Sequence, residues 1–384
     1  MSQDPRTSPQ RRSRYLDALR AVAIVRVYLL HSLWLAWLPV VFPSMPIMFA
    51  LAGYLTAVSL ERGGSVKTIT SRVRRLLPPL WLLAAVALPL MLLHGWITDP
   101  ERPLQWTELV NWVLPLANPP SSTWGGPFAM ALWYLRAYLW FVLISPVLWW
   151  AFRRWPVPAL LLPATAAVLI SIGTLPPTTG HIGDVCWSVA IYGSAWMLGF
   201  ARHTGLLERV AIGWLAAGSA VLAVTGLVWA DTHGVTLVDP VAEMFWGLAF
   251  VLIAMRIRPS FAWLDRVPGA ARVVDVLNAR AVSIYVWHLP ALYFAGFLVA
   301  GIGPIFAVGT VFTVLAVAAT GWVEDLAARR RPVLIPGAPA PLPAPAAAAD
   351  AAAAAGDRPM VGARVGSAAP AIAAALSATT VGAR

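Results

Sequence analysis

The sequence predicts an all-α, polytopic membrane protein with about ten transmembrane helices and both termini in the cytoplasm. Of its 384 residues, 59% are apolar and 12% are charged, whereas a soluble domain is about 45–50% apolar and about 25% charged. The mean hydropathy of +0.71 agrees with this prediction. The composition excludes a soluble globular enzyme and a disordered chain. The single cysteine, Cys186, excludes internal disulfides and cysteine-based metal sites.

Long apolar runs give the predicted spans. The first run is longer than the apolar core of a signal peptide, about 7–15 residues, and no small-residue cleavage site closes it, so we expect an uncleaved span. A spanning helix needs about 20 apolar residues. The spans predicted on that basis are 16–38, 45–60, 76–94, 128–151, 157–173, 186–201, 210–229, 241–255, 281–300 and 303–322.

The charges of the loops test this count independently. Cytoplasmic loops carry an excess of Lys and Arg, and one missed helix would invert the side of every later loop. With the N-terminus inside, nearly all loop cations fall on the cytoplasmic side, and Arg102 is the cation of the outside loops. The outside loops hold Asp99, Glu101, Glu108, Asp184, Asp231 and Asp239. The net charge of +11 therefore indicates orientation in a lipid bilayer, with the plasma membrane as the expected location, rather than nucleic-acid binding.

The composition divides the chain into three parts. Residues 1–14 are a polar cytoplasmic tail, and residues 15–326 are the membrane domain. Residues 327–384 form an Ala/Pro-rich segment with few large side chains. Such a segment buries too little surface to offset its ordering entropy, so we expect a disordered cytoplasmic tail. A helix over the alanine run 346–355 is the alternative.

Ionisable residues inside a bilayer are costly and are functional candidates by default. Arg20 and His31 are 11 residues apart, about 1100° of helical rotation, so both project from one helix face about 16 Å apart along the axis. A cation at the cytoplasmic end suits a phosphate-bearing ligand, and a deeper histidine suits general-base chemistry. The alternative is a topological arginine and a hydrogen-bonded core histidine.

Other polar residues carry weaker signals, each with a structural alternative. Arg72, Arg74 and Arg75 are either topological determinants or phosphate ligands. Arg136 needs a partner, for which Glu243 has the right sign, and serves either in that ion pair or in binding an acceptor. His288 is either a structural hydrogen-bonding group or part of a donor site. Asp17 lies three residues before Arg20, a spacing at which it would orient that side chain.

Several motifs occur in an order that resembles one known family, the type-3 membrane acyltransferases. The family opens with an arginine, ten residues and a histidine, as Arg20 and His31 do here. Further matches are 49–54, which resembles a Phe-rich run ending in Ser-Gly, the basic residues 72–75 followed by Pro78, Pro79 and Trp81, the Leu-Trp-aromatic-Leu segment 132–135, the Tyr-x-Trp-His-x-Pro segment 285–290, and Glu324 after the last helix.

The resemblance implies transfer of an acyl group, commonly acetyl, from acyl-CoA to a hydroxyl of a glycan or glycosylated acceptor. It makes His31 the catalytic residue and Arg20 its essential partner, with an acyl-histidine intermediate as the mechanistic variant. It places Gly53, Trp133 and Tyr134 among the binding residues. It implies no permanently bound cofactor and no metal. The serine of the family's Ser-Gly pair is Ala52 here.

Two other functions are weighed against this one. A transporter typically has inverted repeats and broken spans at matching positions of its two halves, and the sequence has no such pattern. A catalytically degenerate member of the same fold would only bind or scaffold, and Ala52 favours that alternative slightly. Turnover of an acyl thioester would distinguish an enzyme from both the transporter and the scaffold. The sequence indicates no protein partner.

Overall fold

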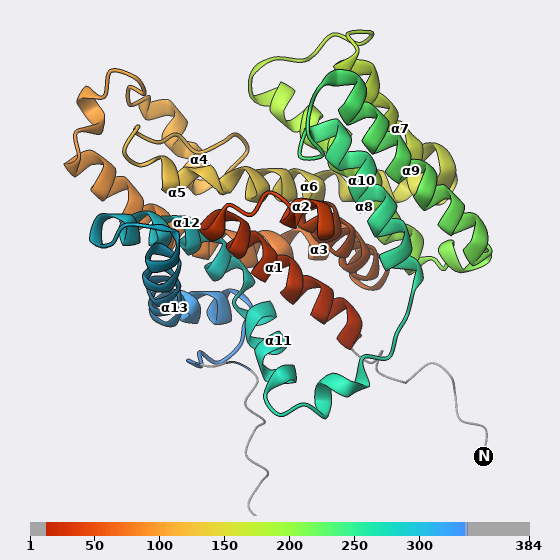
Figure 1. The fold of residues 1–384 in the computed structure, drawn as a ribbon. Coiled ribbons are helices and arrows are strands. Elements are labelled where there is room, and N and C mark those ends of the chain that lie inside the picture. The colour runs from red at the N-terminus through yellow and green to blue at the C-terminus, as the bar shows by residue number, and fades with distance from the viewer. Residues whose placement is uncertain (1–12, 335, 337–384) are drawn as a thin grey trace, which may run out of the picture. The chain divides into compact units, whose positions relative to one another are not determined.

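The computed structural model describes residues 13–334 and 336, and all regular elements among them are helices. The α-helices, shown in Figure 1, are α1 (Arg14–Leu33), α2 (Leu38–Val41), α3 (Ser44–Leu93), α4 (Val110–Val113), α5 (Gly126–Met130), α6 (Leu132–Arg154), α7 (Pro156–Ser171), α8 (Gly180–His203), α9 (Ile212–His233), α10 (Pro240–Arg256), α11 (Ala270–Ala279), α12 (Ala281–Leu298) and α13 (Ile302–Ala327). Short 3₁₀ turns are Trp96–Thr98, Trp106–Leu109, Leu207–Arg209 and Ala262–Asp265. Of the predicted tail 327–384, the part from residue 337 onward, with its alanine run, lies outside the described residues, as do residues 1–12 of the predicted N-terminal tail.

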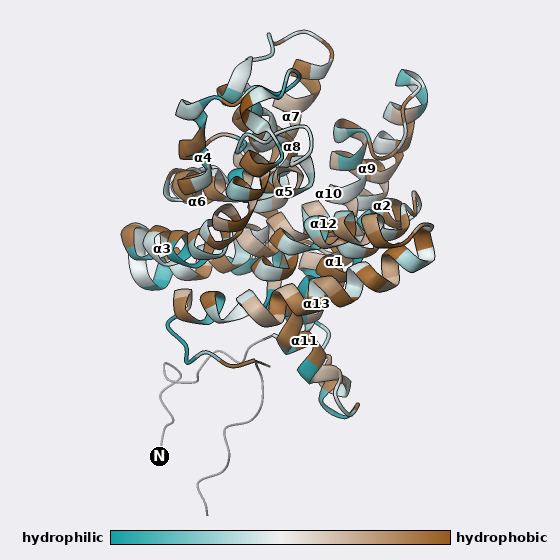
Figure 2. Ribbon diagram, turned by 90° about the vertical axis from the view of Figure 1, so that its left-hand side faces the viewer, coloured by the Kyte–Doolittle hydropathy of each residue, from teal (hydrophilic) through white to brown (hydrophobic). Residues whose placement is uncertain are grey.

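Helices cover each of the ten predicted ranges, which confirms the all-α class. By length and composition, five helical segments of the described chain are long and apolar enough to cross a membrane: Leu38–Leu93, Gly126–Arg154, Ile212–His233, Ala281–Leu298 and Ile302–Ala327. Figure 2 shows these helices mainly in the hydrophobic colour. The count of ten spans and the cytoplasmic side of the termini stay predictions.

The second and third predicted spans belong to one long helical range, α3. It is interrupted at Gly64, whose φ of 73° and ψ of 177° are not helical, so two helices meet there. A positive φ of this kind is readily adopted only by glycine. The sequence predicted a loop between residues 60 and 76, whereas the helical conformation continues through the basic residues up to Pro78 and Pro79.

Several details of the helices differ from the prediction. The first helix ends at Leu33, because Trp34 adopts the left-handed conformation and its N–H bonds to the carbonyl of Leu30. The last helix continues to Ala327, so Glu324 lies within it rather than after it. The predicted loop between the eighth and ninth spans contains α11, whose apolar residues line one face.

Close backbone contact joins α3 to α8 at two glycines. A Cβ at Gly53 would overlap the carbonyl of Trp196, and a Cβ at Gly199 would overlap the carbonyl of Ala50 and the N–H of Tyr54. Small residues allow such an approach, which maximises van der Waals packing where lipid supplies no hydrophobic drive. The structure therefore shows Gly53 as a helix-packing residue, and its predicted binding role stays a prediction.

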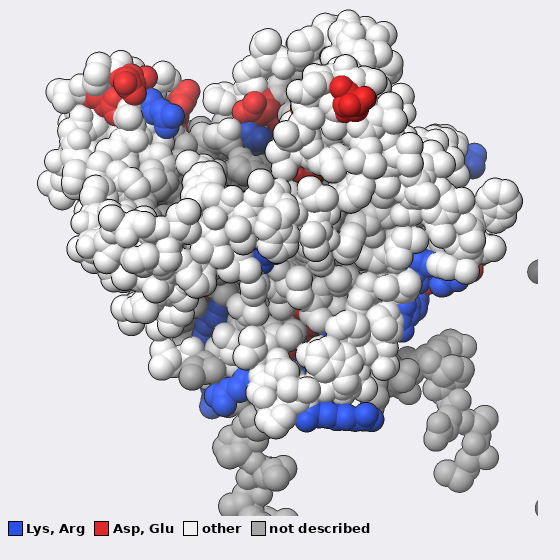
Figure 3. All heavy atoms as spheres, viewed as in Figure 1, with Lys and Arg blue, Asp and Glu red and all other residues white. Residues whose placement is uncertain are grey.

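Charged side chains separate toward opposite ends of the helices. Figure 3 shows Asp and Glu gathered at the upper edge and most Lys and Arg along the lower edge, as the loop assignment predicts. Two of the arginines assigned to cytoplasmic loops are nevertheless buried. Arg202 donates to the carbonyls of Met255 (2.7 Å) and Ile257 (2.9 Å) at the end of α10, and Arg280 donates to Asp325 (2.7 Å). These two cations fix helix ends as well as contributing to charge asymmetry.

The loop after α3 is held by one carboxylate. The N–H of Thr123 donates to Asp99 at 2.7 Å, and the N–H groups of Glu101 and Arg102 donate to it at 3.1 Å each. These hydrogen bonds, led by that of Thr123, hold the pKa of Asp99 below its usual value. Residues 99–102 are thereby tied to the segment that leads into α5.

Replacing Gly199 by alanine should destabilise the α3–α8 crossing by about 1–3 kcal/mol, because the new methyl group meets backbone atoms that cannot rotate away. We expect a melting temperature several degrees lower for the detergent-purified chain. Gly213→Ala in α9 is the matched control, since a Cβ there meets open space. Equal melting temperatures for the two variants would contradict the packing argument.

The hydrogen bonds of Asp99 should loosen in acid. Because the folded-state pKa is lowered, their contribution is present above the unfolded pKa of about 3.9 and is lost as the pH falls through the folded value. Protection of the Thr123 amide against hydrogen exchange, corrected for the intrinsic rate, should fall in that window. Asp99→Asn should remove this pH dependence, and an unchanged profile in the variant would refute it.

Candidate active site

The two leading candidates, Arg20 and His31, both lie on α1, as predicted. The helix packs against α3, α12 and α13, and both side chains are half-buried. Tyr28, one turn before His31, shares a 2.8 Å hydrogen bond with the hydroxyl of Thr310 in α13. This contact fixes the rotation of the last turns of α1, and with it the direction of His31.

His31 meets a second histidine across the α1–α12 contact. Its Nδ1 lies 2.9 Å from Nε2 of His288, and Nδ1 of His288 lies 2.7 Å from the carbonyl oxygen of Tyr285. A carbonyl only accepts, so Nδ1 of His288 carries the proton and its Nε2 accepts from Nδ1–H of His31. When His31 is neutral, its lone pair therefore lies on Nε2, which is the form that a general base needs.

The two histidines differ in exposure. His288 is 1% exposed, whereas His31 is half-buried and lines a cavity of about 240 Å³. The cavity lies among the ends of α1, α5, α12 and α13, and Trp34, which is 76% exposed, marks its opening. A small molecule in the cavity would therefore meet His31 but not the buried His288.

Three tyrosines connect the histidine pair to the other end of the site. Tyr285 lies 5.7 Å from His288 between ring centroids and 5.2 Å from Tyr134, which in turn lies 6.3 Å from Tyr138. The Tyr285 hydroxyl donates to the carbonyl of Ala131 at 2.7 Å, which fixes its ring. The charge of Arg20 acts on Tyr134, so the predicted arginine borders this aromatic row.

The basic residues of α3 gather at the far end of the row. Arg72 donates to the hydroxyl of Tyr138 at 2.9 Å, and Arg74 donates to the carbonyl of Ala327 at the end of α13 at 3.2 Å. The charges of Arg72, Arg74 and Arg330 all act on Arg75. Like charges so close together repel one another, and a polyanion placed among them would relieve that repulsion.

Glu324 holds the start of α12 in place. Its carboxylate accepts from the backbone N–H groups of Val282 and Ser283, at 3.3 Å each, and from the Ser283 hydroxyl at 2.8 Å. These N–H groups belong to the first turn of a helix and have no partner within it. The charge of Arg20 also acts on Glu324. Arg20 thus borders the anchor of the helix that carries His288.

The comparison with known families finds a match for most of this chain. Residues 13–323 match the family model described as an acyltransferase domain. The chain belongs to the type-3 acyltransferase family. The matched range is essentially the membrane domain predicted from the sequence, 15–326. No curated protein and no solved structure gave a match to the chain.

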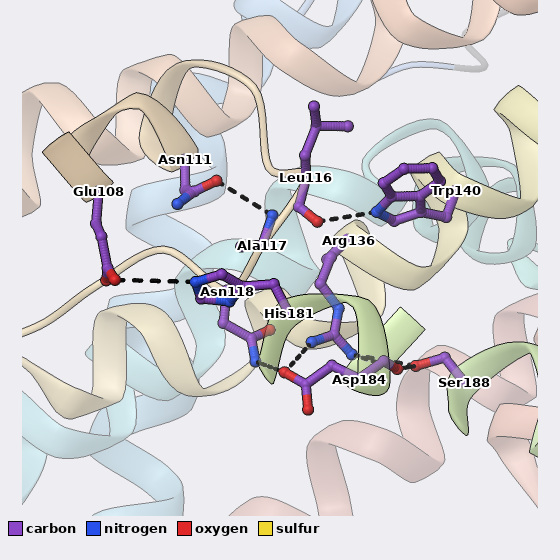
Figure 4. Close-up of polar contacts among 10 residues, drawn as sticks. All are labelled: Glu108, Asn111, Leu116, Ala117, Asn118, Arg136, Trp140, His181, Asp184 and Ser188. Carbon is purple, nitrogen blue, oxygen red and sulfur yellow. Dashed lines mark hydrogen bonds and ion pairs between the residues drawn. The ribbon is translucent and has the colours of Figure 1, made fainter. Parts of the chain in front are cut away.

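In this acyltransferase the partner predicted for Arg136 is wrong. Arg136 donates to Asp184 at 2.8 Å and to the hydroxyl of Ser188 at 3.1 Å, both on α8 (Figure 4). The amide of Asn118 also donates to Asp184, at 3.3 Å. Glu243 instead acts electrostatically on Arg26. The prediction placed Asp184 in an outside loop, whereas α8 begins at Gly180 and carries it within reach of Arg136.

Two other predicted residues, Trp133 and Asp17, make contacts of their own with neighbouring helices. Trp133 stacks on Tyr192 with centroids 5.9 Å apart, on a different face of α6 from the tyrosine row. The backbone carbonyl of Asp17 accepts from Asn278 of α11 at 2.8 Å, and its charge acts on Arg14. The proposed orientation of Arg20 by Asp17 stays a prediction.

Sequence reasoning missed three residues of the site. Tyr138 follows Tyr134 by four residues, a spacing that places both on one helix face, and this signal was available. Tyr285 and Ser283 lie in the late motif, but the resemblance directed attention to His288. Nothing in the sequence indicated that Ser283 would meet Glu324.

The ion pair of Arg136 should contribute to stability. Asp184→Asn leaves the 4% exposed arginine without a charged partner. Since the carboxylate is half exposed, we expect a loss of about 1–2 kcal/mol rather than the 3–5 of a fully buried pair. The readout is the melting temperature in detergent. Asp231→Asn, at an exposed position of α9, should leave it unchanged, and equal losses would refute the assignment.

Proposed function

We propose that this protein transfers an acyl group from acyl-CoA to a hydroxyl of a glycan or glycosylated acceptor at the plasma membrane. One observation carries the proposal: the hydrogen-bond chain from Tyr285 through His288 to His31, which leaves the lone pair of His31 on Nε2. A histidine that acts as general base on an acceptor hydroxyl must be neutral and must present its free lone pair to the hydroxyl. It must also border a space that a substrate can enter.

The reaction follows from this arrangement. Nε2 of His31 accepts the proton of the acceptor hydroxyl as its oxygen attacks the thioester carbonyl. The carbon–oxygen bond forms, the carbon–sulfur bond breaks, and Nε2–H returns the proton to the departing CoA sulfur. While His31 is cationic, its Nδ1–H donates to His288, which lowers the energy of the charge.

The donor is assigned by charge. The nucleotide of acyl-CoA is polyanionic, and Arg72, Arg74 and Arg75 form a cluster of like charges that such a group would neutralise. Arg330, whose charge also acts on Arg75, is paired with Asp325 at 3.0 Å. Arg20 borders the path from this cluster to His31. The acceptor hydroxyl has to reach Nε2 of His31, because Nδ1 is bonded to His288. This arrangement favours acyl transfer between a donor and an acceptor rather than transport of a substrate.

Substitutions at the histidine pair test the proposal. His31→Ala should lower the release of CoA from acyl-CoA in the presence of acceptor by about 10²–10⁴-fold, the usual contribution of a general base. His288→Leu should also lower it, because His31 loses the acceptor that fixes its tautomer. His288→Gln, which keeps an acceptor oxygen, should retain more activity than His288→Leu.

Controls separate chemistry from folding. His233→Ala changes an exposed histidine of α9 and should behave as the unsubstituted protein, and each variant is compared at equal amounts of folded, membrane-inserted chain. Unchanged turnover in a stable His31→Ala protein would refute the role of His31. Equal activity of the two His288 variants would refute the role of the hydrogen bond.

A further inference from the structure

The cavity beside His31 has a lining that the proposed reaction does not itself require. Six of its residues are aliphatic or sulfur-containing and come from α5, α12 and α13: Met130, Leu289, Leu292, Ile302, Ile305 and Pro127. Ser32, at its rim, uses its hydroxyl on the carbonyl of Leu29. The remaining lining residues are His31, Trp34 and Tyr293, so a sugar in this space would meet few hydrogen-bonding groups, and its unpartnered hydroxyl groups would be costly. An alkyl group would be well accommodated.

The cavity lies beyond His31 when the site is followed from the cationic cluster. On α1 the order is Arg20, His31 and then Trp34. On α12 the cavity residues Leu289 and Leu292 follow His288. On α13 the order is reversed: Ile302 and Ile305 lie at the start, and Ala327, bonded to Arg74, lies at the end. The order of residues on all three helices therefore places the cavity on the far side of His31 from the cationic cluster.

The leading end of an acyl-CoA is its acyl chain. With the nucleotide at the cationic cluster and the thioester at His31, the chain extends past His31 into the cavity. An apolar protein cavity of about 150 Å³ holds a benzene molecule, and this one measures about 240 Å³. The two carbons of an acetyl group would leave most of it unfilled.

We propose that the cavity beside His31 is an acyl-chain pocket, and that the donor carries a chain of about four to six carbons rather than acetyl. This inference rests on the proposed function, because it takes the position of the thioester from it. It replaces the acetyl group that the family resemblance suggests with a longer one, on the size and lining of the cavity.

Binding of a donor series tests the proposal without a known acceptor. The full-length chain in detergent is titrated with CoA, acetyl-CoA, butanoyl-CoA and hexanoyl-CoA, and each dissociation constant is obtained from the thermal stabilisation of the protein. Burying one methylene is worth about fourfold in affinity, so butanoyl-CoA should bind about fifteenfold more tightly than acetyl-CoA.

Two variants of one residue locate the effect. Ile305→Phe fills the cavity and should reduce the butanoyl preference to about threefold or less, with the affinity for CoA itself unchanged. Ile305→Ala enlarges the cavity and should shift the preference toward hexanoyl-CoA, which keeps the test valid if the larger side chain prevents folding. Val314→Phe, at a 61% exposed position of the same helix, is the matched control and should keep the preference.

The outcomes separate this inference from the proposed function. If CoA and all three thioesters bind equally, the donor assignment stands and the acyl pocket is wrong; an apolar part of the acceptor would then be the occupant. If Val314→Phe and Ile305→Phe have the same effect, the pocket is also wrong. If none of the CoA compounds binds, the donor of the proposed function itself is wrong.

Discussion

The hydrogen bond between His31 and His288 depends on the exact depth and rotation of α12, and much of the surrounding structure holds that helix in place. Glu324 binds the first N–H groups of α12, and Arg280, just before it, donates to the carbonyl of Gly321 and to Asp325. Tyr285 is tied to Ala131 at the junction of α5 and α6. Buried polar groups in lipid have no water to replace these partners, so each anchor is strongly directional. The geometry of the histidine pair, and thus of the proposed base, is set by anchors that lie outside the lining of the cavity.

Arginines serve three distinct purposes in this chain, although the sequence presents them as one net charge. Some are predicted to mark the cytoplasmic side of the membrane by their position in loops. Others, such as Arg202, are buried and bind the carbonyls at a helix end. A third group surrounds Arg75, on which the charges of Arg72, Arg74 and Arg330 act. A cation whose neighbours are carbonyls or carboxylates has a structural explanation. In the third group Arg330 is paired with Asp325 at 3.0 Å, and the proposed donor would bring an anion to the arginines of α3.

The fold class and the leading pair of residues could be predicted from the sequence because both depend on local rules. Apolar runs set helix positions, and the spacing of Arg20 and His31 sets a shared face. The partner of Arg136 could not be predicted, because it depends on where α8 begins, and Asp184 lies within the first turns that a hydropathy count leaves out. His288 was recognised as a candidate, but its contact with His31 needs the packing of α12 against α1. Glu243 carries the charge opposite to that of Arg136, but opposite charges alone do not show that two residues lie close together.

The order of chemical environments along the site argues for one continuous ligand rather than separate ones. Cations come first, then a row of tyrosines that offers hydroxyl groups and ring faces, then the histidine pair, and finally an apolar cavity. An acyl-CoA has the same order: polyanion, polar arm, thioester and alkyl chain. In the proposed function, a sugar acceptor would need to bring only one hydroxyl to Nε2 of His31. The loss of the family serine at Ala52 is compatible with this view, since that position lies beside the α3–α8 packing contact and outside the row from Arg72 to His31.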